Sequence, residues 1–551
     1  MSASLRTDVS GLRHRWDEDL AAHYRRQGWW DGLTLADRAR ALAEADPQRV
    51  THVDGQTQLT AGQAWQQSGW LAAALAARGF GPGDVLAFQT PNWHEAVLID
   101  LAACRLGLVV CPIVTIYRDR EVELILDDCR ARGIFVAQQF RGFDHQAMLQ
   151  RLRPRLPRLQ QLWTVRGDVG AADDLSTLLA EGREAFAGWS APRVDPDALK
   201  LLLYTSGTTG RPKAVLHSHN TLARSMRRAA AHWGLVAGDT TLMPSPVTHV
   251  TGFTYGLELP FCERVRTVLM AQWDAAQAAA LIEREAIAFT LCATPFLQEL
   301  LDLCERERRS LPSLRSFPCG GAAVPPELIR RVSRVFAHCR AFRVYGSSEA
   351  PVITLGYPQA DQAELAATTD GQVIDYEVRL LGADGRPCAV GEEGEICARG
   401  PGLFLGYAAE ADNAECFDDD GFFHTGDVGQ RTAEGAIVFT GRIKDLINRG
   451  GEKISAKEVE DLLHTHPGVL EAAVVAMPHA RLGETVCAYL ITEPGVEVTL
   501  PALVATLQAA QVARQKHPEA VVLVEQFPRT ASGKVKKDLL RADLRARGLG
   551  V

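Results

Sequence analysis

A glycine- and hydroxyl-rich segment is the first part of the chain whose residue types suggest chemistry. Residues 204–215 have the sequence YTSGTTGRPKAV and follow an apolar run at 201–203. Backbone N–H groups in such a loop can turn towards an anion, and Lys213 adds a compact positive charge. A Walker A loop needs Gly before this lysine and Ser or Thr after it, whereas Pro212 and Ala214 stand here. The segment therefore predicts a polyphosphate-binding loop of another kind, and a solvated turn is the alternative.

Six further segments follow this loop in a fixed order. They are PVTHVTG (246–252), GGAA (320–323), YGSSE (345–349), HTGD (424–427), GRIKDLINRGGEKI (441–454) and PRTASGK (528–534). Together with the first loop they resemble the motifs of the adenylate-forming superfamily, which contains acyl-CoA synthetases, nonribosomal-peptide adenylation domains and beetle luciferases. The resemblance covers residues 30–545. It implies that a carboxylate attacks the α-phosphate of ATP, that pyrophosphate leaves, and that a thiol then displaces AMP.

The resemblance also implies which residues bind the nucleotide. Both reactants of the first step are anions, so the site needs positive charge and metal at the phosphates more than it needs a general base. Tyr345 offers an aromatic face for adenine. Asp427 resembles the carboxylate that accepts both ribose hydroxyls, with Arg442 beside it. The implied ATP and AMP contacts are Thr205, Ser206, Gly207, Thr208, Thr209, Gly210, Lys213, Gly320, Gly321, Ala322, Tyr345, Gly346, Ser347, Ser348, Asp427 and Arg442.

Three further roles follow from the resemblance. Glu349 corresponds to the ligand of Mg²⁺, a cation that prefers oxygen donors and bridges phosphates. Lys534 matches a lysine that reaches across a domain interface to the reacting carboxylate and α-phosphate, whereas Lys536 and Lys537 have no such match and are expected at the surface. Lys444 matches a hinge about which the C-terminal domain rotates between the two half-reactions. This rotation brings a Gly-Gly loop, Gly450 and Gly451, towards the pantetheine chain of CoA.

The segments around His249, Gly320 and Gly346 line the acyl pocket that the resemblance implies, together with Val250 and Phe253. Members that use short acids carry Trp where this chain has Gly346, so a deeper pocket is expected. Dihydroxybenzoate ligases carry Asn after the pocket histidine to bond an ortho hydroxyl, which Val250 cannot do. The sequence therefore favours an apolar acid. His249 is expected beside the substrate carboxylate or at the thiol channel, and a core histidine is the alternative.

The elements that must position these residues alternate between strand and helix. Residues 85–88, 94–106 and 108–111 predict a strand, a helix and a strand, which is a unit of parallel sheet. A second such unit runs from a strand at 314–318 through a helix opened by Pro325 and Pro326 to a strand at 342–345. Between 371 and 441 short β runs separated by turns predict a small β subdomain without a helix of any length.

The pattern changes again after Arg442. Ser455 and Glu458 predict a capping box before a helix that ends near 463. Strands are expected at 472–476, 486–491 and 520–524. The predicted fold is α/β. A large N-terminal domain (1–443) of βαβ layers and a small β subdomain precedes a small, mobile α/β C-terminal domain (444–551) with its hinge at Lys444.

Composition excludes several classes of protein. The chain has 551 residues and a formal net charge of −8, which disfavours a nucleic-acid binder of the basic-patch kind. The most apolar stretch, 96–114, is interrupted by Asp100, Arg105 and Pro112, so no membrane span is expected. No secretory signal is visible at the N-terminus. Twelve scattered cysteines without a Cys-x-x-Cys pair predict reduced thiols and a cytoplasmic location.

The leading hypothesis is an AMP-forming carboxylic acid–CoA ligase that uses ATP and Mg²⁺. The N-terminal run at 24–35 and the segment INRGGEKI look similar to cyclohexanecarboxylate-type ligases and to dihydroxybenzoate ligases. A medium-chain, alicyclic or aryl acid is therefore the expected substrate. A stand-alone enzyme that loads a carrier-protein thiol is the alternative. A non-enzymatic nucleotide binder is expected to lack Lys534 or Glu349, and both are present.

Overall fold

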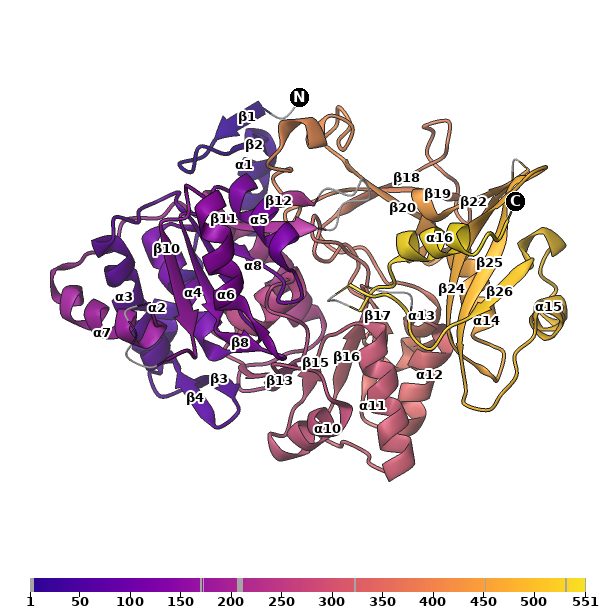
Figure 1. Cartoon of the computed structure of the whole chain (residues 1–551), viewed down its shortest axis with the longest axis horizontal. Helices are drawn as coiled ribbons and strands as arrows, with labels where there is room; N and C mark the ends of the chain where they lie inside the picture. The colour runs from indigo at the N-terminus through magenta and orange to yellow at the C-terminus, as the bar shows by residue number, and fades with distance from the viewer. Residues whose placement is uncertain are drawn as a thin grey trace.

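The computed structural model shows a large N-terminal part and a smaller C-terminal part side by side (Figure 1). It describes residues 4–168, 171, 173–205, 212–321, 324–450, 452–530 and 533–550. The predicted contacts Ser206, Gly207, Thr208, Thr209, Gly210, Ala322 and Gly451 lie outside the described residues. The other predicted site residues can be placed in the fold.

A six-stranded sheet carries the start of the phosphate loop. Its order is β10 (Gln161–Val165), β7 (Gly133–Ala137), β5 (Val85–Gln89), β6 (Val109–Pro112), β11 (Leu199–Thr205) and β12 (Lys213–Ser218). Strands β5 and β6 are parallel and are joined by α4 (His94–Leu106), as the first predicted unit requires. Almost every residue of α4 is buried, which explains its continuous apolar sequence. Only β11 and β12 run antiparallel in this sheet.

A seven-stranded sheet supports the other predicted pocket segments. Its order is β17 (Arg340–Arg343), β16 (Ser316–Cys319), β15 (Phe289–Thr290), β13 (Thr240–Met243), β14 (Arg266–Leu269), β3 (Val50–Asp54) and β4 (Thr57–Thr60). Strands β16 and β17 are parallel and flank α12 (Pro326–Val335), which confirms the second unit. The strand expected at 342–345 ends two residues earlier, because the Tyr345 N–H donates to the side chain of Thr354 instead of continuing the ladder.

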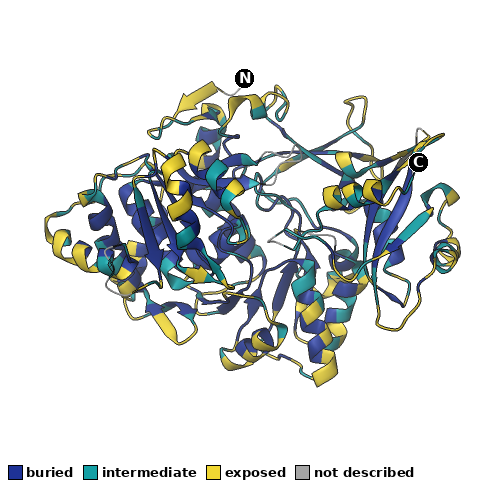
Figure 2. Ribbon diagram, in the orientation of Figure 1, coloured by how far each residue is buried: buried dark blue, intermediate teal, exposed yellow. Residues whose placement is uncertain are grey.

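The remaining elements cover these sheets. The helices are α1 (Glu18–Arg26), α2 (Leu35–Ala45), α3 (Ala61–Ala77), α5 (Asp119–Asp128), α6 (His145–Leu152), α7 (Leu175–Ala185), α8 (His219–His232), α9 (Leu259–Glu263), α10 (Ala275–Arg284), α11 (Thr294–Glu307) and α13 (Ala363–Thr368). Two small hairpins pair β1 (Ser4–Thr7) with β2 (Arg13–Trp16) and β8 (Gln139–Phe140) with β9 (Phe143–Asp144). In Figure 2 buried residues fill the central strands of the two large sheets, whereas the outer helices are exposed on one side, strand β1 is exposed and strand β4 is partly exposed.

The predicted β subdomain is a four-stranded antiparallel sheet. It consists of β18 (Glu377–Leu381), β19 (Glu393–Arg399), β20 (Phe423–Arg431) and β21 (Ile437–Arg442). All residues from 371 to 441 are described, and the only helical segment among them is the short 3₁₀ turn η5 (Glu410–Asn413). The sequence pattern therefore gives this subdomain correctly.

The C-terminal part is a separate α/β unit. Its sheet contains β23 (Glu452–Ile454), β22 (Ile447–Arg449), β25 (Gly483–Thr492), β24 (Val469–His479) and β26 (Ala520–Leu523), and its helices are α14 (Ala456–Leu463), α15 (Leu500–Ala509) and α16 (Lys537–Ala546). Strands β24 and β25 extend beyond the expected segments at both ends. The short helix η6 (Ile443–Asp445) joins this unit to β21 and contains the predicted hinge residue.

Two expectations for the C-terminal part need correction. Ser455 caps α14 by accepting a bond from the Glu458 N–H at 3.1 Å, but the Glu458 carboxylate binds Lys516 instead of completing a capping box. Lys537, expected at the surface, is half-buried and pairs with Glu460 at 2.7 Å. Neither partner is close in sequence, so local pattern could not reveal these bonds.

All twelve cysteines are free thiols, and most are buried. Over the described ranges, none of the helices combines the length and the apolar character that a membrane crossing needs.

Candidate active site

Lys534 comes from the C-terminal part and reaches the N-terminal part. It lies in the loop between β26 and α16, where its N–H donates to the Thr530 hydroxyl at 3.1 Å. Its Cε is 3.9 Å from the position that a Cβ on Gly321 would take. The neighbouring Gly533 has a φ of +85° and packs against Pro295. In Figure 1 this yellow segment extends from the C-terminal part towards the centre of the molecule.

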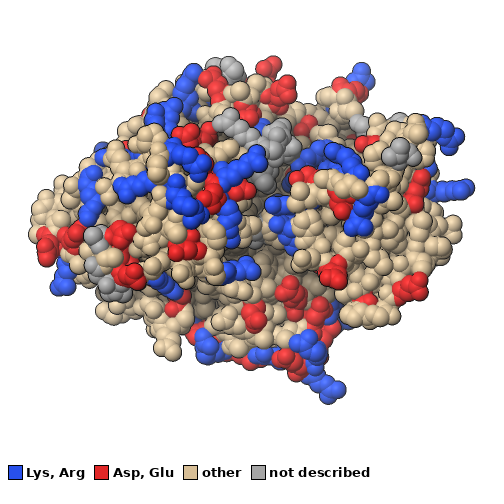
Figure 3. All heavy atoms as spheres, viewed as in Figure 1, with Lys and Arg blue, Asp and Glu red and all other residues tan. Residues whose placement is uncertain are grey.

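The charges around Lys534 suit an anionic ligand. Burial, together with the charges of Arg442 and Lys444, lowers the pKa of Lys534 to about 8, and the carboxylates of Asp427 and Glu349 oppose this shift. Three cations and two carboxylates therefore face a common region. Figure 3 shows the surface hollowed between the two parts of the molecule, with Lys and Arg side chains on both sides of the hollow. Phosphates placed there would be held mainly by positive charge.

Asp427 is held by two of the residues that the sequence analysis assigned to the same site. The Tyr345 hydroxyl donates to one carboxylate oxygen at 2.8 Å, and the Arg442 Nε lies 3.1 Å from the other. Asp427 and Arg442 are direct cross-strand partners on β20 and β21. Burial raises the pKa of Asp427, and the charge of Arg442 opposes this rise. The arrangement presents an aromatic ring and a buried carboxylate side by side.

The Tyr345 ring has a neighbour that the sequence analysis missed. The ring of Phe439 stacks on it with centroids 5.7 Å apart and ring planes 19° from parallel. Phe439 is on β21 and is separated from Tyr345 by most of the β subdomain, so only the fold brings the rings together. One face of Tyr345 is therefore covered by protein, and the opposite face is left as the candidate adenine surface.

Glu349 and Lys213 meet through a second tyrosine that sequence reasoning did not identify. The Tyr407 hydroxyl donates to a Glu349 carboxylate oxygen at 2.8 Å. The Lys213 ammonium lies 4.8 Å from the centre of the Tyr407 ring and 3.4 Å from Asp412. The remaining Glu349 oxygen is the kind of hard donor that Mg²⁺ takes, so this residue fits the predicted metal.

The strands fix the ends of the phosphate loop. Thr205 at the end of β11 lies opposite Lys213 at the start of β12, so the two strands are antiparallel neighbours up to the described ends of the phosphate loop. Next to this strand pair, the backbone N–H of Ser347 donates to the Ala350 carbonyl at 2.9 Å, and the Ser347 hydroxyl accepts from the Ala350 N–H. The Ser348 carbonyl accepts from the His217 ring at 2.7 Å.

Close backbone approaches explain the glycines of the predicted pocket. A Cβ on Gly320 would lie 2.5 Å from the Val344 carbonyl oxygen, and one on Gly346 would lie 2.4 Å from that of Pro351. No side chain fits at either position without a backbone movement. Gly346 therefore has a structural role besides its predicted role in the pocket, because the turn that follows it can form only without a side chain at this position.

The His249 segment begins a π-helix, η3 (Gly252–Glu258). The His249 N–H donates to the Pro246 carbonyl, and a Cβ on Gly252 would lie 2.0 Å from that same oxygen, which explains the Pro-x-x-His-x-x-Gly pattern. Burial, followed by the charge of Lys534, lowers the pKa of His249 to about 4. The imidazole is thus neutral at pH 7 and close to Lys534.

The two apolar residues of the predicted pocket differ in their surroundings. Val250 keeps a small exposed fraction. Phe253 is fully buried, and the Lys200 ammonium lies 5.0 Å from the centre of its ring. Lys200 is itself buried between Asp100 and Glu258. Phe253 therefore packs in the core behind the segment, and its role in substrate contact stays a prediction.

The predicted hinge residue and the Gly-Gly loop differ in their relation to Lys534, because the charge of Lys444 acts on Lys534 whereas Gly450 is bonded within the C-terminal part. Lys444 is exposed within η6, and the Leu446 N–H donates to the Arg442 carbonyl across it at 3.1 Å. Gly450 has a φ of +62°, and its N–H donates to Leu482 within the C-terminal part. Among the described residues, the contacts bring Lys534 to the Gly321 turn and do not bring Gly450 there.

Comparisons with known proteins agree with this arrangement. A model of the AMP-binding enzyme family matches residues 39–408, and a model of the AMP-binding enzyme C-terminal domain matches residues 458–534. The structure of ATP-bound MatB from Rhodopseudomonas palustris superimposes with a TM-score of 0.82 and 25% identity, covering 93% of this chain and 99% of that one.

Curated relatives match over nearly the whole chain. The medium-chain fatty-acid–CoA ligase of Escherichia coli K12 is 35% identical, over 96% of this chain and 94% of that protein. A salicylyl-CoA synthase / salicylate adenylyltransferase from a Streptomyces species is 33% identical, over 97% of both. The salicyl-AMP ligase / salicyl-S-ArCP synthetase of Mycobacterium tuberculosis is also 33% identical, over 96% of this chain and 94% of that protein.

Proposed function

We propose that this chain, which belongs to the AMP-binding enzyme family, is an AMP-forming carboxylic acid–CoA ligase for apolar acids. The observation that carries the proposal is the convergence of Lys534, from the C-terminal part, with Asp427, Arg442 and Glu349 of the N-terminal part. These residue types are what adenylation requires, because two anions must be brought together without a strong general base.

In the first half-reaction the nucleotide is held from two sides. Asp427 accepts hydrogen bonds from the ribose hydroxyls, the face of Tyr345 opposite Phe439 stacks on adenine, and Lys213 neutralises phosphate charge. Lys534 and Arg442 face the α-phosphate and the attacking carboxylate. Glu349 would hold Mg²⁺, which supplies charge neutralisation at the phosphates when bound. The His249 imidazole is neutral, so it can lie beside the substrate carboxylate without carrying an additional proton.

In the second half-reaction the C-terminal domain, residues 444–551, rotates about Lys444. The rotation withdraws Lys534 and brings the loop of Gly450 and Gly451 to the site, where a chain without side chains permits close approach of pantetheine. The CoA thiol then displaces AMP. The support for this step is the position of η6, which is the single connection between the two parts after Arg442.

The acid is proposed to be medium-chain, alicyclic or aryl. Val250 offers no hydrogen bond to an ortho hydroxyl, and Gly346 excludes a blocking side chain. The name of the Escherichia coli relative includes a medium-chain fatty acid, which agrees with this choice. The name of the Mycobacterium tuberculosis relative includes a carrier-protein thioester, which keeps a carrier-protein thiol as the second candidate acceptor. The free state of all twelve cysteines supports a cytoplasmic location.

The decisive experiment measures pyrophosphate release over a panel of carboxylic acids, with and without CoA. We expect AMP and pyrophosphate as products, and rapid turnover only when CoA is present. Formation of ADP and orthophosphate would overturn the adenylation mechanism. Pyrophosphate release with a tightly held acyl-adenylate, unchanged by CoA but accelerated by a carrier protein, would select the second candidate.

A further inference from the structure

A bulge in the β subdomain lies directly beside the proposed ribose carboxylate. Cys397 on β19 pairs with His424 on β20, whereas Glu395 pairs with Val428. One residue therefore separates the two pairs on β19 and three separate them on β20. The extra residues are accommodated at Gly426, whose φ is +69° and whose missing Cβ has no atom within 4 Å. This glycine is thus needed for its backbone conformation rather than for space.

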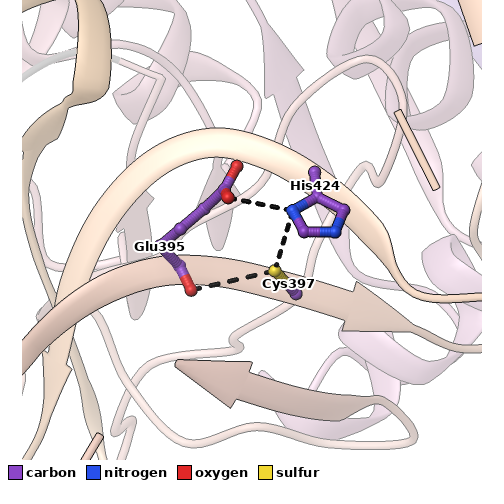
Figure 4. Close-up of side chains that lie close together, drawn as sticks. All are labelled: Glu395, Cys397 and His424. Atoms are coloured by element: carbon purple, nitrogen blue, oxygen red, sulfur yellow. Dashed lines mark hydrogen bonds and ion pairs between the residues drawn. The ribbon is translucent and has the colours of Figure 1, made fainter. Parts of the chain in front are cut away.

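Glu395 holds the bulge from the neighbouring strand. One of its carboxylate oxygens accepts the Gly426 N–H at 3.1 Å, and the other lies 2.9 Å from the His424 Nδ1 (Figure 4). A carboxylate can only accept, so this Nδ1 carries the hydrogen. The Cys397 sulfur lies 3.4 Å from the same ring nitrogen. The Glu395 side chain therefore binds both His424, which precedes the bulge, and Gly426, which lies within it.

A second set of bonds continues this support to Asp427. The Thr425 hydroxyl donates to the Ile396 carbonyl at 2.7 Å and accepts the Asp427 N–H at 3.1 Å. A bulge beside an active site redirects the side chain that follows it. Here the following side chain is Asp427, whose carboxylate points to Tyr345 and Arg442.

We propose that Glu395 is a positioning residue for nucleotide binding, because it fixes the bulge that aims the Asp427 carboxylate at the ribose hydroxyls. The inference rests on the proposed function of Asp427 and extends it to a residue that does not touch the substrate. The Glu395, Cys397 and His424 donor atoms also lie close enough together to hold a metal ion. Hydrogen bonding is favoured, because Glu395 already accepts from Gly426 and from the protonated ring nitrogen.

The test compares Glu395→Ala, Glu395→Gln and His424→Ala with Glu393→Ala, an exposed matched control two residues earlier on β19. Loss of hydrogen bonds to a charged group leads us to expect that Glu395→Ala raises the Kd for ATP about 10-fold, with the KM for the acid unchanged. His424→Ala should have a smaller effect, since the Gly426 bond remains. Glu395→Gln should bind ATP nearly as the wild type does, because its amide can accept from Gly426 and donate to the other histidine tautomer.

Direct titration of ATP by calorimetry separates this inference from the proposed function. A wild-type protein that fails to bind ATP contradicts the proposed function itself. Wild-type binding with equal affinity in Glu395→Ala overturns only the positioning role, and so does an equal rise in both KM values, which indicates general loss of structure. Stoichiometric zinc in the purified protein, with activity lost on chelation, also overturns it in favour of a metal site.

Discussion

Arg442 and Asp427 face each other across β20 and β21, and Arg442 is also the last residue before η6. The Arg442 Nε lies 3.1 Å from the Asp427 carboxylate. The residue that contacts the proposed ribose carboxylate therefore also begins the connection to the C-terminal domain. If Asp427 binds the ribose as proposed, this cross-strand pair links nucleotide binding to the position of the C-terminal domain.

Asp427→Asn should weaken nucleotide binding more than it weakens acid binding. The amide keeps the shape of the side chain but replaces an acceptor oxygen by a donor and removes the charge that faces Arg442. Loss of a charged hydrogen bond of about 1.5–3 kcal/mol corresponds to a rise of roughly 10- to 100-fold in the KM for ATP. Asp419→Asn is a matched control, because Asp419 is an exposed aspartate of the same subdomain, and an equal effect of both changes would contradict the ribose assignment.

The alkaline pH dependence of adenylation should report Lys534. Its pKa is lowered to about 8 in the free protein, so the ammonium is present below that pH and is lost above it. We expect kcat/KM for ATP to fall about tenfold per pH unit above this value, because this quantity titrates the free enzyme. Bound phosphates favour the charged form, so kcat should fall only at higher pH.

Lys534→Arg provides the control for this pH dependence. The guanidinium remains charged throughout the range, so the alkaline limb should disappear even if the rate is reduced. If the alkaline fall in kcat/KM near pH 8 persists in this variant, that fall belongs to a group other than Lys534. His249, with a pKa lowered to about 4, should contribute no limb between pH 5 and 7.

Local sequence pattern was sufficient for the elements that carry the site. The helix predicted at 94–106 has those bounds, because an almost entirely buried helix and its flanking strands are continuous apolar runs. The helix opened by Pro325 and Pro326 was also found, since proline is favoured at a helix start. The order of the motifs then indicated which loops share a site.

Contacts between distant segments could not be predicted in this way. Phe439 stacks on Tyr345 and Tyr407 binds Glu349, yet neither aromatic residue lies within a motif whose spacing points to its partner. The bulge at Gly426 depends on the pairing of β19 with β20, which a single sequence does not specify. The signal that was available is the dipeptide Thr425-Gly426, because glycine beside a hydroxyl residue marks an irregular turn.

Acid selectivity tests the pocket assignments. We expect acetate to be a poor substrate and benzoate or a medium-chain acid to react at least as well as salicylate, since Val250 cannot bond the ortho hydroxyl. A satisfied polar contact can contribute about 10⁴-fold in discrimination, so Val250→Asn should shift the ratio of kcat/KM towards salicylate. The control is Val250→Thr. Val247→Asn is unsuitable as a control, because Val247 is fully buried in the core. A wild-type preference for salicylate would contradict the pocket assignment.

The two half-reactions can be separated through the domain that carries Lys534. One positive charge about 4 Å from the reacting phosphate contributes up to about 4 kcal/mol at an effective dielectric constant of about 20, or roughly 10²–10³ in rate. Lys534→Ala should slow pyrophosphate release by that factor and leave thioester formation from purified acyl-adenylate nearly unchanged. Lys536→Ala is the matched control, because it removes a lysine charge two residues further along the same loop.

Lys444→Pro should have the opposite effect. Position 444 is the second residue of η6, and N–H groups in the first turn of a helix have no partner within it, so proline at this position breaks no bond of the turn itself. Its fixed φ obstructs the rotation that thioester formation requires, whereas Lys444→Ala leaves φ free and should permit both steps. Pyrophosphate release times the first half-reaction, and acyl-adenylate with CoA times the second. If Lys534→Ala and Lys444→Pro slowed both steps equally, the lysine and hinge assignments would have to be abandoned, even with ligase activity established.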